Sequence, residues 1–93
     1  MRAKKRLDWT QTARHQYLDQ LGWIAERNPV AAENVQSRIE HSLELIRSDP
    51  ALGTPDKKKR RRHAVPHTPF TVYYRIKQSS IQVLRVLHQR QDR

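Results

Sequence analysis

Two apolar stripes with helical spacing, separated by only a few residues, constrain the fold of this chain more than any other feature. Their residues recur at steps of three and four, which places them on one face of a helix. The stripes consist of Ala13, Tyr17, Leu21 and Ile24, and of Ala32, Val35, Ile39, Leu43 and Ile46. Between them, Asn28 is a good N-cap and Pro29 suits a first helical position, where its missing N–H has no cost. So short a link predicts an antiparallel helix hairpin.

Alternating apolar and polar residues predict strands in the second half of the chain. The segments 70–76 (FTVYYRI) and 81–87 (IQVLRVL) are rich in β-branched and aromatic residues, and the intervening KQSS predicts a hairpin turn. The alternation places Phe70 and Tyr74 in the core and leaves Tyr73 exposed. Shorter strands are predicted at 62–65 and at 4–10.

These elements together predict an α+β fold with the order β-α-α-β-β-β. We expect the two-helix hairpin to pack on one face of a small, twisted, mostly antiparallel sheet in which 81–87 is a central strand. A length of 93 residues is typical of one domain, so residues 1–93 are predicted to form a single unit. Trp23 falls off the first apolar stripe; both packing at the helix edge and contact with a partner remain open.

The positive charge of the chain is concentrated in its second half. The net charge is +10, with 19 basic against 9 acidic residues. Residues 1–46 carry seven basic and six acidic side chains, whereas residues 47–93 carry twelve and three. Such a field favours polyanionic partners, either nucleic acid or an acidic protein.

Several classes of protein are excluded or disfavoured. Without cysteine, the chain can form neither disulfides nor thiolate metal sites. His63 and His67 lie four apart on a strand-and-proline segment, where they would not converge on a metal, and two glycines cannot build a phosphate-binding loop, so no metal or cofactor is expected. No apolar run is long enough to span a membrane, and we expect a cytoplasmic protein.

Six consecutive cations, Lys57–Arg62, interrupt the chain between the predicted helices and strands. Three interpretations are open: a solvated loop, a surface that contacts a polyanion, and a nuclear-localisation or heparin-type patch. We favour the contact surface, which would meet acidic side chains of an inhibitor or the phosphates of a nucleic acid.

Four segments resemble the ParE/RelE superfamily of bacterial toxins, the toxin halves of type II toxin–antitoxin modules. They are NPVAAENV (28–35), DPALGTPD (49–56), TPFTVYYRI (68–76) and LRVLHQRQ (84–91), and the resemblance runs from about Leu7 to Arg90. It implies a cognate acidic antitoxin as partner in a toxin–antitoxin complex. It also implies one of two activities: binding and poisoning of DNA gyrase in the ParE branch, or ribosome-dependent cleavage of mRNA in the RelE branch.

The residues favour the ParE branch. The resemblance to RelE implies an arginine directly after the aromatic residue of the third strand, but here Thr71 follows Phe70. The C-terminal HQRQDR contains no tyrosine. A ribonuclease would then have to rely on His88 as acid or base and on Arg90 and Arg62 as phosphate ligands.

We therefore predict a non-enzymatic toxin that binds DNA gyrase and is neutralised by its antitoxin. The alternatives are an mRNA endoribonuclease acting on ribosomes and a plain basic nucleic-acid-binding module. The helix hairpin is expected to supply an apolar groove for an antitoxin helix near Trp23. The residues predicted to contact target or antitoxin are Arg60, Arg61, Arg62, Arg75, His88, Arg90 and Trp23.

Overall fold

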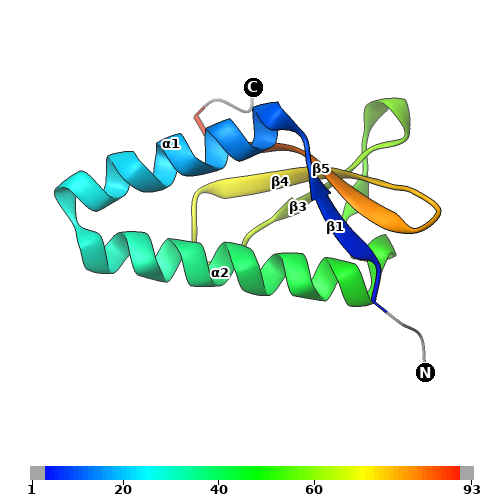
Figure 1. Cartoon of the computed structure of the whole chain (residues 1–93), viewed down its shortest axis with the longest axis horizontal. Coiled ribbons are helices and arrows are strands. Elements are labelled where there is room, and N and C mark those ends of the chain that lie inside the picture. Colours follow the sequence, from blue (N-terminus) through cyan, green and yellow to red (C-terminus); the bar gives the residue numbers. More distant parts are fainter. Residues whose placement is uncertain (1–3, 91–93) are drawn as a thin grey trace.

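The computed structural model describes residues 4–90 of the chain, which form two helices and a five-stranded sheet (Figure 1). The helices are α1 (Gln11–Arg27) and α2 (Pro29–Ser48), and short 3₁₀ segments occupy Pro50–Leu52 (η1) and Lys57–Lys59 (η2). The strands are β1 (Arg6–Trp9), β2 (Thr54–Pro55), β3 (Arg61–Ala64), β4 (Phe70–Ile76) and β5 (Ser80–His88).

The strand order is β1-β5-β4-β3-β2, which places β5 and β4 at the centre. β1 pairs with β5 in parallel, and the other three pairs are antiparallel. The predicted α+β class and element order are confirmed. The two-residue strand β2 was not predicted, because its segment reads as a loop between Pro50, Gly53 and Pro55.

One residue ends the first helix and begins the second, as the sequence predicts. The backbone N–H of Asn28 donates to the carbonyl of Ile24 at 2.7 Å, which closes α1. The Asn28 side chain accepts a 3.1 Å hydrogen bond from the N–H of Ala31, which caps α2. At the start of α1, the Thr10 hydroxyl caps the N–H of Ala13 in the same way. The helices are therefore held as a tight hairpin (Figure 1).

The core lies between this hairpin and one face of the sheet, which we call the inner face. Both predicted apolar stripes contribute to it, with Ile39, Leu43 and Ile46 of α2 fully buried. Tyr17 of α1 packs on Trp9 with ring centroids 5.0 Å apart. From the sheet come Phe70, Val72, Tyr74, Ile81, Val83 and Val86.

A β-bulge at Leu84 determines which residues of β5 reach the core. Tyr74 pairs with Val83 but Tyr73 pairs with Arg85, so Leu84 is the extra residue. Without the bulge, strict alternation would put Val83 and Arg85 on the same face. With it, Val86 is buried and Arg85 is exposed.

Helix α1 also covers the open edge of β5. β1 pairs with β5 only as far as Val83, so the next stretch of β5 lacks a neighbouring strand on that side. The Gln16 side chain accepts a 2.9 Å hydrogen bond from the N–H of Val86. The Gln20 amide donates a 2.8 Å hydrogen bond to the carbonyl of Val86. Two glutamines thus replace a missing strand. Neither helix within residues 4–90 has the length and apolar character needed to cross a bilayer.

Candidate binding surfaces

Three arginines surround Tyr73 on the outer sheet face, the face that points away from α1 and α2. In the register of the sheet, Arg62 of β3 and Arg85 of β5 lie opposite Tyr73 on either side. Residues paired in this way point to the same face, and Arg75 joins them because it lies two residues along β4. Arg62 and Arg85 are exposed, and Arg75 is half-buried. The outer sheet face is therefore a cationic surface.

The prediction that Tyr73 is exposed was wrong. Its side chain does point to the outer sheet face, but only 3% of it is accessible. The Arg60 guanidinium lies 4.5 Å from the ring centroid, and Asp56 accepts a 2.8 Å hydrogen bond from Arg60. The backbone N–H of Lys57, with Arg60, lowers the pKa of Asp56 below its usual range. Alternation correctly gave the direction of the tyrosine and could not show what covers it.

The Arg61 side chain is hydrogen-bonded to the backbone of the loop that precedes β3. It lies opposite Tyr74 in the register, on the inner side of the sheet edge. Its guanidinium donates to the carbonyl of Gly53 at 2.7 Å and to that of Ala51 at 3.4 Å. Of the three consecutive arginines, Arg62 is the one whose side chain stands exposed. Arg60 and Arg61 mainly shape the surface that Arg62 joins.

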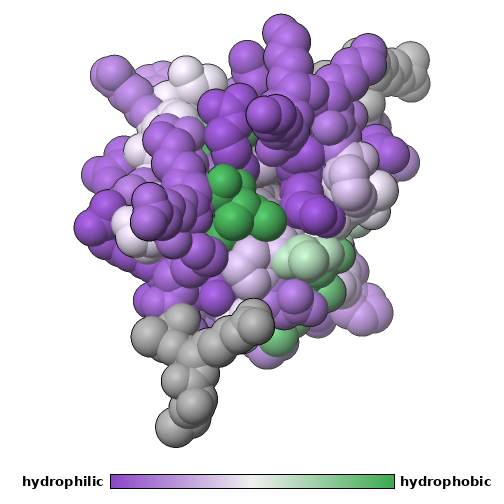
Figure 2. Space-filling view, turned by 90° about the vertical axis from the view of Figure 1, so that its right-hand side faces the viewer, coloured by the Kyte–Doolittle hydropathy of each residue, from purple (hydrophilic) through white to green (hydrophobic). Residues whose placement is uncertain are grey.

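The three lysines Lys57–Lys59 form an exposed tip between β2 and β3. They occupy η2, and Lys58 and Lys59 have φ angles of 60° and 61°, in the left-handed region. The backbone closes the tip through the Asp56 N–H, which donates 2.8 Å to the carbonyl of Arg60. The tip lies at the same end of the molecule as the β4–β5 turn (Figure 1). Viewed from that end, the surface is mostly hydrophilic around a small hydrophobic patch (Figure 2).

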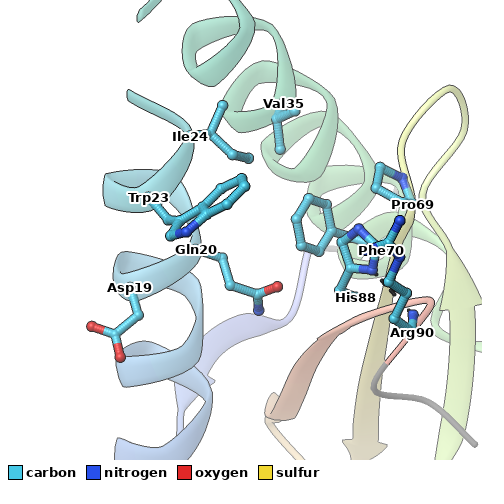
Figure 3. A pocket seen from close by; sticks show the side chains of 9 residues that line it. All are labelled: Asp19, Gln20, Trp23, Ile24, Val35, Pro69, Phe70, His88 and Arg90. Atoms are coloured by element: carbon cyan, nitrogen blue, oxygen red, sulfur yellow. Dashed lines mark hydrogen bonds between the residues drawn. The ribbon is translucent and has the colours of Figure 1, made fainter. Parts of the chain in front are cut away.

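A second candidate surface is an apolar pocket of about 530 Å³ between α1, α2 and the far end of the sheet. Figure 3 shows Trp23 of α1 and Phe70 of β4 lining it from opposite sides, while Asp19 at its margin points away. The remaining lining residues are Gln20, Ile24, Val35, Pro69, His88 and Arg90.

Charged groups stand at the margin of this pocket. Trp23 is 59% exposed, and the Arg27 guanidinium lies 3.7 Å from the centroid of its ring. On the opposite side, His88 packs edge-on against Phe70 at 5.4 Å. The N–H of Arg90 donates a 3.1 Å hydrogen bond to Nδ1 of His88. The pocket is thus apolar inside, and Arg27, Arg90 and Asp19 are the charged residues at its margin.

The three residues predicted for a ribonuclease are only partly brought together. β5 ends at His88, and Arg90 lies in a turn rather than on a continuing strand. His88 pairs with Phe70 and faces the pocket on the inner side of the sheet, whereas Arg62 pairs with Tyr73 and points outward. Of the three residues, His88 and Arg90 are neighbours, and Arg62 lies on the other face.

The histidines that could have suggested a metal site have separate positions. The Nε2 atom of His63 lies 3.2 Å from the Ser42 hydroxyl, and burial lowers the pKa of His63 below 6.5. His67 lies in the exposed β3–β4 loop with a φ of 62°. Among residues 4–90, no three histidine or carboxylate side chains are placed to hold a metal ion.

Sequence reasoning missed Arg85 and most of the pocket. Arg85 is a lone cation in an apolar strand, and only the bulge at Leu84 reveals that it joins Arg62 beside Tyr73. The pocket residues come from both helices and from one end of the β4–β5 pair, where the start of β4 meets the end of β5. Trp23, His88 and Arg90 are the lining residues that the sequence had singled out as contact residues.

Comparison with known proteins identifies the family. The family model described as "ParE toxin of type II toxin-antitoxin system, parDE" matches residues 7–93. A protein of Sinorhizobium fredii, named "Putative toxin Y4kP", is 33% identical over 92 residues, which cover 97% of this chain and 94% of that protein. The solved structure "Chromosomal ParDE TA system from P. aeruginosa" matches with a TM-score of 0.78 over 91% of this chain and 96% of the other.

That structural match has 20% sequence identity and shows the shared fold. The matches in sequence, in contrast, cover nearly the whole chain. This chain therefore belongs to the ParE toxin family of type II toxin–antitoxin systems.

Proposed function

We propose that this toxin acts by binding DNA gyrase and that a cognate acidic antitoxin neutralises it in the cytoplasm. One observation supports binding over bond cleavage more than any other. His88, the residue suited to acid–base catalysis, lies on the inner side of the sheet, and Arg62 lies on the outer side. Ribonuclease chemistry needs a proton acceptor and phosphate-binding cations around one scissile bond, so these two cannot serve the same phosphate.

The pocket suits the antitoxin. An acidic segment with an apolar side chain at its centre could bury that side chain against Trp23 and Phe70, while its carboxylates meet Arg27 and Arg90. Aromatic and arginine side chains around a pocket are the usual anchors of tight interfaces. The arginines of the outer sheet face remain available for the target, so antitoxin and target need not share every contact.

One observation favours mRNA cleavage as a second candidate function. His88 and Arg90 adjoin each other beside a pocket that could admit a base. Arg90 could then bind the phosphate that His88 helps to cleave. Arg62 would have no part in this arrangement.

A parallel assay on two targets separates these functions. The purified chain is incubated with gyrase and supercoiled plasmid, and separately with translating ribosomes. We expect linear or gyrase-linked plasmid in the first reaction and intact mRNA in the second. Cuts in A-site mRNA that disappear in His88→Ala and Arg90→Ala, with normal gyrase activity, would instead establish the ribonuclease.

The antitoxin part of the proposal has its own test. A short open reading frame directly beside the toxin gene should encode an acidic protein with a DNA-binding N-terminal region. Its product should co-purify with this chain and restore gyrase activity. If the product binds the chain but gyrase stays inhibited, neutralisation by covering these surfaces is contradicted.

A further inference from the structure

The outer sheet face and the lysine tip carry six cations that form no salt bridge with the carboxylates of residues 4–90. They are Lys57, Lys58, Lys59, Arg62, Arg75 and Arg85. Within residues 4–90, none of the six forms a salt bridge. Two carboxylates of this region are already occupied, because Asp8 is bound by Arg6 and Asp56 by Arg60. The surface therefore presents positive charge to an external anion.

We propose that this surface binds the phosphate backbone of duplex DNA directly, without sequence preference and without gyrase. The proposal goes beyond the proposed function, because it holds for the toxin alone. Its first support is the density of charge, since clustered lysines and arginines on one face are the electrostatic footprint of a nucleic-acid-binding protein. The mostly hydrophilic end of the molecule in Figure 2 fits this role.

The spacing of the arginines suits a phosphate backbone. Arg62 and Arg85 flank β4, so their Cα atoms lie two strand spacings apart, about 10 Å. Arg75 lies two residues from Tyr73 along β4, about 7 Å away. These spacings lie between the widths of the minor and major grooves of B-DNA, roughly 6 and 12 Å. Flexible arginine side chains on a rigid sheet can thus reach phosphates on both sides of one groove.

The same face lacks what single-stranded nucleic acid needs. Proteins that bind single strands stack the bases on exposed aromatic rings. On the described outer sheet face, Tyr73 is the aromatic residue of β4, and its ring is covered by Arg60 and only 3% accessible. Trp23 lies at the pocket instead. With cations and no stacking ring, the surface favours a duplex, whose phosphates are outside and whose bases are already stacked.

The backbone of the lysine tip gives a second, independent indication. Left-handed φ angles are unfavourable for most residues other than glycine, and asparagine or glycine would fit better there. Positions 58 and 59 are nevertheless lysines, both exposed and both in this conformation. Unfavourable backbone geometry of this kind concentrates at functional sites. Here the strain is tolerated where it holds three ammonium groups beyond the sheet edge.

Fluorescence anisotropy with a fluorescein-labelled 24-base-pair duplex of random sequence tests the proposal. The full chain is titrated at salt concentrations from 50 to 300 mM, with no gyrase present. If six cations contact phosphates, log K falls with log salt at a slope of about −5. The double variant Arg62→Gln/Arg85→Gln should make this slope shallower by about 2 and weaken binding at 100 mM salt at least tenfold.

A matched variant controls for general charge. The double variant Arg14→Gln/Arg38→Gln also removes two positive charges, but from exposed positions on the helices. It should leave the affinity within about twofold and the slope unchanged. Should the sheet variant fail to fold by circular dichroism, the triple variant Lys57→Gln/Lys58→Gln/Lys59→Gln replaces it, since these side chains are exposed.

Three results would overturn the proposal. The first is no binding to the duplex at 50 mM salt. The second is an equal loss of affinity in the sheet and helix variants, which would show a general charge effect. The third is tighter binding of single-stranded DNA or duplex RNA than of duplex DNA. Because gyrase is absent from this assay, a negative result leaves the gyrase proposal standing, and a failed gyrase assay leaves DNA binding standing.

Discussion

The hydroxyl of Tyr74 joins the central strand β4 to the loop after α2, and it does so through Gly53. The N–H of Gly53 donates to this hydroxyl at 2.8 Å, and the hydroxyl donates to the carbonyl of Pro50 at 2.7 Å. A Cβ atom on Gly53 would lie 2.6 Å from the hydroxyl and 2.9 Å from the carbonyl oxygen of Arg62. The loop therefore approaches the sheet as closely as a glycine allows, and it positions the strand that carries Arg62.

Gly53→Ala is expected to destabilise the fold by about 3 kcal/mol, because Tyr74 is fully buried and cannot move aside. Urea unfolding measures the change. Gly22→Ala is the control: a Cβ there meets nothing within 4 Å, and alanine in a helix should stabilise by about 0.5–1 kcal/mol. Equal stabilities of the two variants would contradict the close approach.

Removing the side chain that covers the edge of β5 should expose its backbone. Gln16→Leu leaves the N–H of Val86 without its partner, and the expected cost is about 1–3 kcal/mol. Hydrogen exchange of the Val86 amide should accelerate in this variant. The control is Gln36→Leu, since Gln36 donates only to the exposed Glu40 on α2. Unchanged exchange at Val86 would show that Gln16 does not protect the strand.

The buried His63 makes stability depend on pH. Burial holds its folded pKa below 6.5, so above pH 6.5 the folded and unfolded states are both neutral. As pH falls below 6.5, the unfolded state binds the proton first, and the free energy of unfolding decreases until the folded pKa is reached. Chemical unfolding at pH 7.5 and 5.0 should show this loss in the natural chain and less of it in His63→Gln.

The exposed histidine of α2 provides the comparison for this measurement. His41→Gln removes an exposed histidine outside the core and should keep the pH dependence of the natural chain. If His63→Gln and His41→Gln lose the same stability between the two pH values, burial of His63 is not the cause.

Trp23 should matter for the antitoxin and hardly for folding. Trp23→Ala removes one of the two aromatic rings that line the pocket from opposite sides, and loss of such an anchor typically costs about 2 kcal/mol or more, which is about 30-fold in affinity. The unfolding free energy should change by under about 0.5 kcal/mol, because the side chain is 59% exposed. Isothermal titration calorimetry with the co-purifying antitoxin measures the affinity.

Leu18→Ala is the matched control for Trp23→Ala, since Leu18 is also 59% exposed on α1 but lies outside this pocket. It should bind the antitoxin as the natural chain does. Equal affinity of Trp23→Ala and the natural chain would place the antitoxin elsewhere.

The features that sequence predicts well here are the local ones. Apolar spacing and the Asn28–Pro29 pair predict the helix hairpin. Alternation predicts β4 and the part of β5 before the bulge at Leu84. Contacts between segments far apart in the chain could not be predicted from the sequence. The bulge at Leu84 reverses the alternation and moves Arg85 to the outer sheet face, and Arg60 covers Tyr73 from a loop thirteen positions earlier.

The candidate site was predictable only in part for the same reason. A run of cations can be read directly from a sequence. Which of them bind other groups of the same chain, and which stay exposed, cannot. Arg61 donates a hydrogen bond to the Gly53 carbonyl, and Arg60 donates one to Asp56. Within the described residues, Arg62 has no comparable hydrogen bond or salt bridge. The separation of Arg62 from His88 depends on register and on the side of the sheet, which only the folded chain defines.

Direct binding to gyrase in the absence of DNA is the simplest test of the proposal that this toxin acts on gyrase. Purified gyrase is immobilised on a biosensor without DNA, and the chain is passed over it at increasing concentration. We expect saturable binding that the antitoxin abolishes and that the double variant Arg62→Gln/Arg75→Gln weakens. No binding to gyrase by a chain that does cleave mRNA on ribosomes would contradict the proposal.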